Sequence, residues 1–323
     1  MKVYLGIDVG SVSTKIAALS EDKELVCHTY LPTQGNPVAA IQQALADIER
    51  LLPADSSIEG VAATGSARHL AGAVAGADLV KNEITSQAVA TLHYYPDVQT
   101  IFEIGGQDSK IIIIRDGVVT DFGMNTVCAA GTGSFLDHQA QRLNMSIERF
   151  SRLAMDSSTP SNIIGRCTVF AESDMIHKQQ SGCRIEDIVY GLCRTLVRNY
   201  LSNVGLGKEV KPPIVFQGGV AFNRGIVRAF KEELGAEIIV PAHHQIMGAI
   251  GAALLVQEEA RDKKSGFRGF AICRQDFSVT SLECDICPCL CQVSRLWLDD
   301  EAIADWGGRC QQWREAVKSE VCR

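Results

Sequence analysis

The chain has 323 residues, of which 46% are hydrophobic, enough for a large core arranged as two lobes and a small extension. Its formal net charge is −7, its pI is near 5.6, and its basic residues are scattered, which argues against binding to nucleic acid or to an anionic membrane surface. No apolar run reaches the ~18 residues of a membrane helix, and Asp8 interrupts the N-terminal apolar run before a signal-peptide core forms. We therefore expect a soluble, cytoplasmic protein.

A hairpin with a polar tip is predicted at the N-terminus. Two short apolar strands, residues 3–8 and 16–19, flank a turn rich in hydroxyl groups at residues 10–15. The backbone N–H groups and hydroxyls of such a turn suit phosphate oxygens, Lys15 adds a positive charge, and Asp8 can hold Mg²⁺ through water. Taken alone, the segment is also compatible with an ordinary polar hairpin. The pattern G-x-x-x-x-G-K-[ST] is absent, which excludes a P-loop.

The hairpin pattern returns in the middle of the chain. Before it, the spacing predicts a helix, a strand and a second helix at residues 37–52, 58–64 and 82–95. Strands at 100–104 and 111–114 then flank a turn that contains Gly105, Gly106 and Lys110, and Asp116-Gly117 predicts the next hairpin turn. Both hairpins join an acid, glycine, polar residues and a lysine. Facing one another, they would clamp a triphosphate from both sides.

Two isolated cysteines precede helical patterns. Cys128 is followed by a turn with Gly131 and Gly133, which runs into a helix, and Cys167 stands just before an apolar turn. Glycine lets the backbone approach a ligand closely, and a helix N-terminus favours anions such as phosphate or an electron-rich cluster. Either cysteine alone is also compatible with a small buried hydrophobe.

The rest of the second half reads as helices and strands. A long helix spans 185–204, and Cys193 falls beside its apolar stripe, so we expect a core residue there. A buried-type strand at 213–216 leads to Gly218 and Gly219, which can let adenine or ribose approach the backbone, and Asn223 can cap the next helix. The last strand, at 238–241, precedes a helix of small residues that can pack tightly.

Twelve cysteines without a signal peptide favour metal or redox chemistry over disulfides. Seven of them crowd the last fifty-odd residues, behind a charged linker at 258–269. The densest group is a C-x2-C-x-C-x-C pattern, which favours one shared metal centre of zinc or iron–sulfur type with Cys284, Cys287, Cys289 and Cys291 as ligands. Because the linker separates it from the rest, we expect this tail to be a separate unit. The tryptophans of the tail suggest a small packed cap or a contact surface.

Six motifs then point to a known family. They are Gly6-Ile7-Asp8-Val9-Gly10-Ser11, Glu103-Ile104-Gly105-Gly106-Gln107-Asp108, Cys128-Ala129-Ala130-Gly131-Thr132-Gly133, Cys167-Thr168-Val169-Phe170-Ala171-Glu172-Ser173, Gly218-Gly219-Val220-Ala221 and Gly248-Ala249-Ile250-Gly251-Ala252-Ala253. Together, over about residues 1–257, they resemble the ATP-dependent activators of 2-hydroxyacyl-CoA dehydratases and the ATPase subunits of benzoyl-CoA reductases. The tail departs from this pattern, because typical stand-alone activators end near residue 257, and its cysteines resemble a segment of larger fused activases.

The resemblance implies an α/β, two-lobed fold of the acetate kinase, sugar kinase, Hsp70 and actin type. The first lobe would span 1–97, with a helix at 245–257 returning to it, the second lobe 98–241 would carry the cluster cysteines, and 258–323 would be a linker and a cysteine-rich extension. The resemblance further implies a homodimer that holds one [4Fe-4S] cluster through Cys128 and Cys167 of each subunit. The ligand count agrees, since a cubane cluster needs four thiolates.

The matched motifs also imply a set of site residues. Asp8, Lys15, Gln107 and Asp108 would be catalytic, acting on ATP and Mg²⁺. The residues expected to contact the nucleotide are Gly10, Ser11, Ser13, Thr14, Gly105, Gly106, Lys110, Gly131, Gly133, Gly218, Gly219, Asn223, Gln245 and Gly248.

The implied function is ATP-driven delivery of a low-potential electron to an acceptor dehydratase or reductase, with a donor such as ferredoxin or flavodoxin. Hydride chemistry is disfavoured because no G-x-G-x-x-G follows a strand. A small-molecule kinase of the same fold would use both phosphate hairpins but needs no cluster. A non-catalytic iron–sulfur module with a regulatory nucleotide site is a third interpretation. The cysteine pair argues against the kinase, and the complete phosphate-binding set argues against the module.

Overall fold

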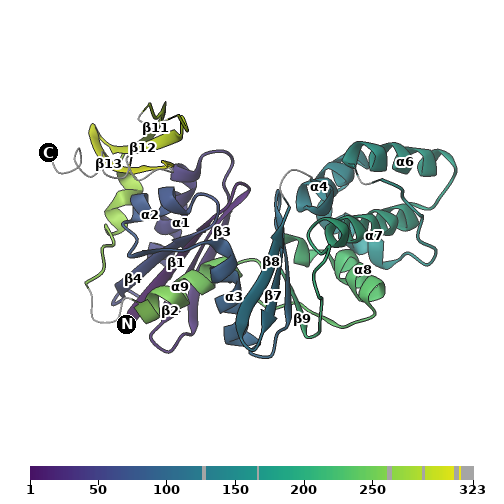
Figure 1. Ribbon diagram of the computed structural model, residues 1–323, viewed down its shortest axis with the longest axis horizontal. Coiled ribbons are helices and arrows are strands. Elements are labelled where there is room, and N and C mark those ends of the chain that lie inside the picture. Colours follow the sequence, from purple (N-terminus) through teal and green to yellow (C-terminus); the bar gives the residue numbers. More distant parts are fainter. Residues whose placement is uncertain (126–128, 166, 260–263, 286–287, 309–312, 314–323) are drawn as a thin grey trace. The chain divides into compact units, whose positions relative to one another are not determined.

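The computed structural model describes residues 1–125, 129–165, 167–259, 264–285, 288–308 and 313 (Figure 1). The chain divides into two compact units, Met1–Ser86 with Gly248–Arg323, and Gln87–Met247. This division places the tail with the N-terminal residues. No helix among the described residues is long and apolar enough to cross a membrane.

The first unit is built on a five-stranded sheet with the strand order β3-β2-β1-β4-β5. The first three strands are antiparallel neighbours, and β4 and β5 continue from β1 as parallel strands. The strands are β1 (Lys2–Val9), β2 (Ser13–Ser20), β3 (Leu25–Pro32), β4 (Ser57–Thr64) and β5 (Leu79–Val80). The helices are α1 (Pro37–Leu51), α2 (Arg68–Ala75), α3 (Glu83–Tyr94), which continues into the second unit, and α9 (Met247–Glu259).

Helices cover the central strand closely, which explains its almost continuous apolar sequence. Val3, Leu5 and Ile7 of β1 are fully buried in one core with residues of α1 and α2. On α9, the small residues allow backbone contact, as the sequence predicted. A Cβ atom on Gly6 would lie 1.8 Å from the Ala249 carbonyl oxygen, so only glycine fits at that point of β1.

The second unit repeats this topology. Its sheet has the order β10-β9-β6-β7-β8, in which β6, β7 and β8 are antiparallel neighbours and β9 and β10 run parallel to β6. The strands are β6 (Thr100–Ile104), β7 (Ser109–Arg115), β8 (Val118–Met124), β9 (Ile214–Gln217) and β10 (Ile238–Ile239). The duplication inferred from the two hairpins therefore extends to all five strands of each sheet.

Helices α4, α6, α7 and α8 lie on one side of this second sheet (Figure 1). The 3-10 helices of the unit are η1 (Ala129–Gly131) and η2 (Gly219–Phe222). Its α-helices after α3 are α4 (Gly133–Arg142), α5 (Ile147–Met155), α6 (Thr168–Gln180), α7 (Ile185–Asn203) and α8 (Arg224–Leu234). Cys193 on α7 is fully buried in the core between these helices and the sheet, which confirms that it is a packing residue.

The tail forms a small antiparallel sheet in the order β11-β12-β13. Its elements are η3 (Phe270–Arg274), β11 (Phe277–Glu283), β12 (Gln292–Leu298) and β13 (Glu301–Trp306). Leu296 and Ile272 are buried in the same core as β1, α1 and α2, and Trp306 packs against that core. Gln42 of α1 also donates from Nε2 to the Ile272 carbonyl at 2.9 Å. The sheet thus packs on the first unit, despite the charged linker before it.

Leu296→Ala tests this shared core. Since Leu296 is fully buried there, we expect the free energy of unfolding to fall by about 2–5 kcal/mol, as for other large-to-small core substitutions. Val279→Ala is the matched control, because Val279 lies opposite Leu296 in the sheet but is 44% exposed, and its effect should stay within about 0.5 kcal/mol. Urea unfolding followed by circular dichroism measures both. Equal effects would contradict the shared core.

Candidate functional site

Each unit places a carboxylate opposite a lysine at the tip of its first hairpin. Asp8 pairs with Lys15 across β1 and β2, and Lys15 Nζ lies 3.4 Å from Asp8 Oδ2. Glu103 pairs with Lys110 across β6 and β7, and Lys110 Nζ lies 2.9 Å from Glu103 Oε2. The two halves of the chain therefore share this charged pair as well as their strand order.

In the first hairpin, hydrogen bonds fix the turn around Asp8. The Gly10 N–H donates to the Ser13 carbonyl at 3.0 Å. Thr14 is fully buried, with its hydroxyl 3.0 Å from that of Thr33, whereas Ser11 is exposed and Ser13 buried. Asp8 is itself 7% exposed, so its carboxylate is held in place by its surroundings.

Behind Asp8 stands Gly65, directly after β4. Its φ is +92°, and a Cβ atom there would lie 2.6 Å from Asp8 Oδ1. A side chain at this position would displace the carboxylate of Asp8. Glycine avoids this clash and also adopts the positive φ without strain.

In the second hairpin, Lys110 is shared between two carboxylates. Its Nζ donates to Asp108 Oδ2 at 2.8 Å as well as to Glu103, and Lys110 is 2% exposed. Burial of a lysine requires such partners. The Gly105 N–H donates to the Asp108 carbonyl at 2.9 Å, which closes the turn. Gln107 is exposed at the tip, and Asp108 is half-buried, so both side chains are accessible to a ligand.

The second hairpin is joined directly to the start of α4. The Gly133 N–H donates to the Gly105 carbonyl at 2.9 Å, and the Ser134 N–H donates to the Gly106 carbonyl at 2.7 Å. The Ser134 hydroxyl donates to the same Gly106 oxygen. A Cβ atom on Gly133 would lie 3.0 Å from the Gly105 carbonyl oxygen, which explains glycine at this close approach, and Gly131 packs against Tyr200 of α7. The segment after Cys128 therefore ends on the polar turn; Cys128 itself lies outside the described residues.

Cys167 is exposed immediately before α6, where it occupies the N-cap position. The loop before it is tightly held. Gly165 accepts a hydrogen bond from Asn199 Nδ2 at 3.1 Å, and a Cβ atom on it would lie 2.6 Å from the Ala171 nitrogen. The Ile164 N–H donates to Asp174 Oδ2 at 2.7 Å. Ile164 and Gly165 are thus held in place by α6 and α7, and Cys167 presents an accessible thiol at a helix N-terminus.

Glu172 connects this helix to α4. Its Oε2 lies 2.8 Å from His138 Nε2, and its Oε1 forms an ion pair with Arg142 Nε at 2.8 Å. Both partners lie on α4, so Glu172 ties the two helices that follow the predicted cluster cysteines. Glu172 belongs to the motif that begins at Cys167, but the sequence did not predict its partners on α4. It also predicted no role for Ser134.

The loop after β9 brings together several residues expected near the nucleotide. The Gly218 N–H donates to the His244 carbonyl at 2.8 Å, and His244 Nδ1 donates to the Gly218 carbonyl at 2.9 Å. Burial lowers the pKa of His244, which favours the neutral ring. Gly219 follows in η2 and is half-buried, and Gly248 is buried in α9 of the first unit. Asn223 caps α8, as predicted, by accepting hydrogen bonds from the N–H groups of Gly225 and Ile226.

Asn223 and Gln245 each also carry a buried polar atom that has no hydrogen-bond partner in the described part of the chain. Among the described residues, neither Asn223 Nδ2 nor Gln245 Oε1 makes a hydrogen bond. A buried polar group left in this way costs about 1–3 kcal/mol, which a bound ligand can recover. The two atoms therefore fit polar contacts to a ligand.

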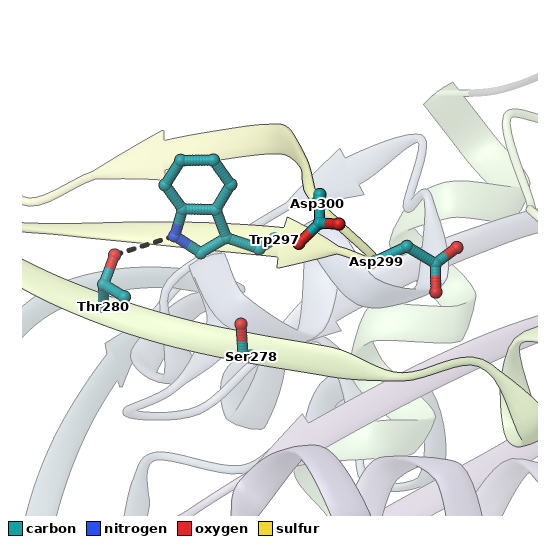
Figure 2. A pocket seen from close by; sticks show the side chains of 5 residues that line it. All are labelled: Ser278, Thr280, Trp297, Asp299 and Asp300. Carbon is teal, nitrogen blue, oxygen red and sulfur yellow. Dashed lines mark hydrogen bonds between the residues drawn. The ribbon is translucent and has the colours of Figure 1, made fainter.

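In the tail, Cys284 and Cys291 are buried, Cys289 is exposed, and Cys287 lies outside the described residues. Within the described part, no three His, Cys, Asp or Glu side chains gather closely enough to hold a metal ion. Farther along the tail sheet is a pocket lined by Ser278, Thr280, Trp297, Asp299 and Asp300. Figure 2 shows the indole of Trp297 hydrogen-bonded to Thr280, with both aspartates at the following turn. None of the predicted site residues lines this pocket.

Comparison with known proteins identifies the family. Residues 5–256 match the BadF/BadG/BcrA/BcrD ATPase family, about four fifths of the chain. The chain belongs to this family. All the hairpins, glycine turns and helix starts described above, except those of the tail, fall within the matched residues.

Three proteins similar to this BadF/BadG/BcrA/BcrD family member match it over most of their length. The chain is 35% identical to the (R)-2-hydroxyglutaryl-CoA dehydratase activating ATPase of Acidaminococcus fermentans, covering 80% of this chain and 99% of that protein. It is 34% identical to the 2-hydroxyisocaproyl-CoA dehydratase activator of Clostridioides difficile, covering 80% and 97%. It is 26% identical to one of the subunits of the benzoyl-CoA reductase of Thauera aromatica, covering 79% and 93%. Membership of this ATPase family, with activators among its members, supports ATPase activity.

Solved structures agree on the fold. Component A of (R)-2-hydroxyglutaryl-CoA dehydratase from A. fermentans has a TM-score of 0.75 at 32% identity, covering 80% of this chain and 99% of that one. A ROK family glucokinase from Streptomyces griseus has a TM-score of 0.50 at 14% identity, covering 79% and 99%, and shows a shared fold only. The α/β fold of the sugar kinase and actin type, implied by the resemblance, is confirmed for the two units.

Proposed function

We propose that this chain is an ATP-hydrolysing iron–sulfur activator that delivers a low-potential electron to a partner enzyme of the 2-hydroxyacyl-CoA dehydratase or benzoyl-CoA reductase type. One observation carries the proposal beyond ATP hydrolysis alone. The helix that follows Cys128 starts on hydrogen bonds from Gly133 and Ser134 to the Gly105-Gly106 turn. A change at this turn when phosphate binds or leaves would therefore reach the start of α4, which follows Cys128 closely in the sequence.

The polar groups of both hairpins and of the loop after β9 serve ATP and Mg²⁺ in this proposal. Lys15 and the backbone of the first turn bind phosphate oxygens, and Asp8 and Asp108 position Mg²⁺ through its water ligands. Gln107, exposed at the tip of its turn, orients the attacking water. Asn223 Nδ2 and Gln245 Oε1 recover their missing hydrogen bonds from the nucleotide.

Cys128 and Cys167 of two copies of the chain would hold one [4Fe-4S] cluster, which when bound supplies a one-electron carrier. The described residues fit this role. Cys167 is exposed at a helix N-terminus, where partial positive charge favours an anionic centre. Around it, Ile164, Val169 and Phe170 are 70%, 67% and 69% exposed, an apolar surface that a second copy would cover in a homodimer. A ferredoxin or flavodoxin would supply the electron.

Coupling between the two functions would run through contacts already formed. The Gly105-Gly106 turn holds the first residues of α4, and Glu172 holds α4 to α6 through His138 and Arg142. Phosphate release at the turn then shifts both helix starts together and alters how the thiols of Cys128 and Cys167 are exposed to a partner. In this path Glu172 is a positioning residue, since it acts through His138 and Arg142.

Glu172→Gln should weaken this coupling. The variant keeps the size of the side chain but loses its charge, so its bonds to His138 and Arg142 weaken. We expect normal phosphate release and an intact cluster, but about 2- to 30-fold fewer electrons delivered per ATP, the range of a 0.5–2 kcal/mol coupling effect. Glu148→Gln, on the exposed face of α5, is the matched control and should match the wild type. A Glu172 variant that loses ATP hydrolysis and electron delivery equally would contradict a coupling role.

The proposal as a whole is tested by supplying the anaerobic protein with reductant and a purified 2-hydroxyacyl-CoA dehydratase. Electron transfer to the dehydratase should require ATP and should stop with ADP. A small-molecule kinase of the same fold would instead consume ATP only when given its phosphate acceptor. Electron transfer that proceeds at the same rate without ATP would overturn the proposal.

A further inference from the structure

Two buried thiols face one another at the end of the β11–β12 hairpin. Glu283 and Gln292 are paired across the two strands, so Cys284 and Cys291 form the next pair, and the Cys284 N–H donates to the Cys291 carbonyl at 2.8 Å. In a hydrogen-bonded antiparallel pair the Cα atoms lie about 5.5 Å apart, and both side chains point to the same face of the sheet. A disulfide joins residues whose Cα atoms are about 4.4–6.8 Å apart. The backbone therefore holds these two thiols within reach of a bond to each other.

Formation of that bond needs only a small movement of the hairpin. Opposite Cβ atoms of an antiparallel pair are about 4.5–5.5 Å apart, whereas those of a disulfide are about 3.8 Å apart, so the strands must approach by about 1 Å at this pair. Leu290, directly before Cys291, has a φ of 43°. A bulky residue rarely adopts this left-handed conformation, which indicates that the surrounding chain fixes the position of Cys291.

The pair lies outside both main cores. Cys284 and Cys291 are 4% and 8% exposed, and Val293 is the third buried side chain of their cluster, against which Trp313 packs. Side chains alternate between the two faces of a strand, so this cluster lies on the opposite face of the sheet from Leu296, which belongs to the core shared with β1. A cluster with so few buried side chains opens locally at a low free-energy cost, and opening gives a small oxidant access to both thiols.

Two other cysteines show the contrasting cases. All the cysteines among the described residues are free thiols. Cys193 is fully buried in the core of the second unit, and it is the one cysteine among the described residues of that core. Cys289 is exposed on the loop of the tail hairpin rather than held in its strand pairing. Cys284 and Cys291 differ from both because each has a second thiol directly opposite.

We propose that Cys284 and Cys291 form a reversible disulfide when the protein meets a peroxide. The buried, directly opposed pair in a two-stranded hairpin carries this proposal. One thiol gives up its proton and attacks an oxygen of hydrogen peroxide, the O–O bond breaks, hydroxide leaves with that proton as water, and a sulfenic acid remains. The second thiol then attacks the same sulfur, and its proton leaves with the hydroxyl group as a second water. Two thiols thereby lose two electrons, and one peroxide molecule gains them.

The bond makes the tail hairpin a redox-sensitive cross-link. It closes the loop of residues 285–290 and restricts the freedom of this segment when the tail unfolds. Because the pair lies on the face away from Leu296, the core shared with β1 keeps its packing in both redox states. A reducing dithiol restores the two thiols by disulfide exchange. The switch is independent of the proposed electron transfer.

The test is peroxide treatment of the full-length Cys167→Ser protein, in which no cluster bound through Cys167 reacts with the oxidant. We expect one equivalent of hydrogen peroxide to remove about two alkylatable thiols per chain, and dithiothreitol to restore both. Proteolytic cleavage before Asp285 separates Cys284 from Cys291. Mass spectrometry should then find the two peptides joined, and fragmentation should identify Cys291 as the partner of Cys284.

Substitutions supply the matched controls. Cys284→Ser and Cys291→Ser should each abolish the linkage. Cys289→Ser, on the loop between them, should keep it. Cys193, which has no opposed thiol among the described residues, should stay reduced at the same dose of peroxide.

Other results would overturn the proposal. Cys284 and Cys291 that both remain alkylatable after peroxide, or a link from Cys284 to Cys287 or Cys289, would contradict the assigned pair. Oxidation that dithiothreitol does not reverse would exclude a reversible bond. Thiols of the untreated protein that react only after a chelator is added would indicate a metal site in place of the disulfide. The peptide map of the unsubstituted tail decides among these outcomes even where a serine variant fails to fold.

Discussion

Asp8→Asn and Asp108→Asn should each lower ATP hydrolysis by about 100-fold or more, because the protein contributes mainly positioning and electrostatic stabilisation to phosphoryl transfer. Asp8 is buried at the tip of the first hairpin beside Lys15, and Asp108 shares Lys110 with Glu103 in the second. Each asparagine keeps the size of the side chain but removes the charge that would position hydrated Mg²⁺. Phosphate release at saturating Mg·ATP measures the effect.

A matched control and a second readout make this result interpretable. Asp116→Asn changes an aspartate in the β7–β8 turn of the second sheet, where a positive φ of 51° suits asparagine equally well, and it should hydrolyse ATP at the wild-type rate. Both test variants should retain the iron absorption of the wild type, since neither change removes a thiolate. Wild-type hydrolysis in both variants would place the nucleotide at another part of the chain.

Cys167→Ser should abolish the bridging cluster and weaken the homodimer. A cubane cluster needs four thiolates, and a dimer with two matched cysteines per chain has none to spare. We expect iron per dimer to fall from about four to below one and electron delivery to cease, while the folded units keep ATP hydrolysis. Cys128→Ser should behave in the same way. Iron analysis, absorption spectra and the sedimentation behaviour of the anaerobic protein measure these changes.

Cys183→Ser is the matched control for that variant. Cys183 is also an exposed thiol of the second unit, shortly after α6, but no motif includes it. It should keep the iron, the dimer and electron delivery. Equal iron in Cys167→Ser and in Cys183→Ser, measured with the tail cysteines replaced, would contradict the assignment of Cys167 as a ligand.

Much of the fold follows from local pattern. The apolar runs of β1 and β6, each with an acid as its next-to-last residue and followed by a polar turn and a lysine, predicted both hairpins. The small residues of α9 predicted a tightly packed helix, although not that it packs on β1. The hairpins are local features, because the two strands and the turn of each one adjoin in the sequence. The duplication was therefore visible in the sequence, although the full strand order of each sheet was not.

Other features depend on contacts between distant segments. The charged linker suggested a separate tail, yet Leu296 shares a core with β1, which no periodicity reveals. The hydrogen bond of Ser134 to Gly106, and the contacts of Glu172 with His138 and Arg142 of α4, join positions far apart in the chain. In the tail, spacing alone grouped Cys289 with Cys284 and Cys291, whereas burial separates the exposed thiol from the buried pair.

Iron per dimer in the anaerobically purified protein, with its absorption spectrum, tests the central claim most directly. To exclude any metal of the tail, the measurement uses the Cys284→Ser, Cys291→Ser double variant beside the wild type. The account predicts a brown dimer with about four irons in both proteins and broad absorption that bleaches on reduction. The contradicting result is a protein that is still colourless and free of iron after treatment with iron and sulfide, yet hydrolyses ATP. Such a protein would be an ATPase without an electron carrier.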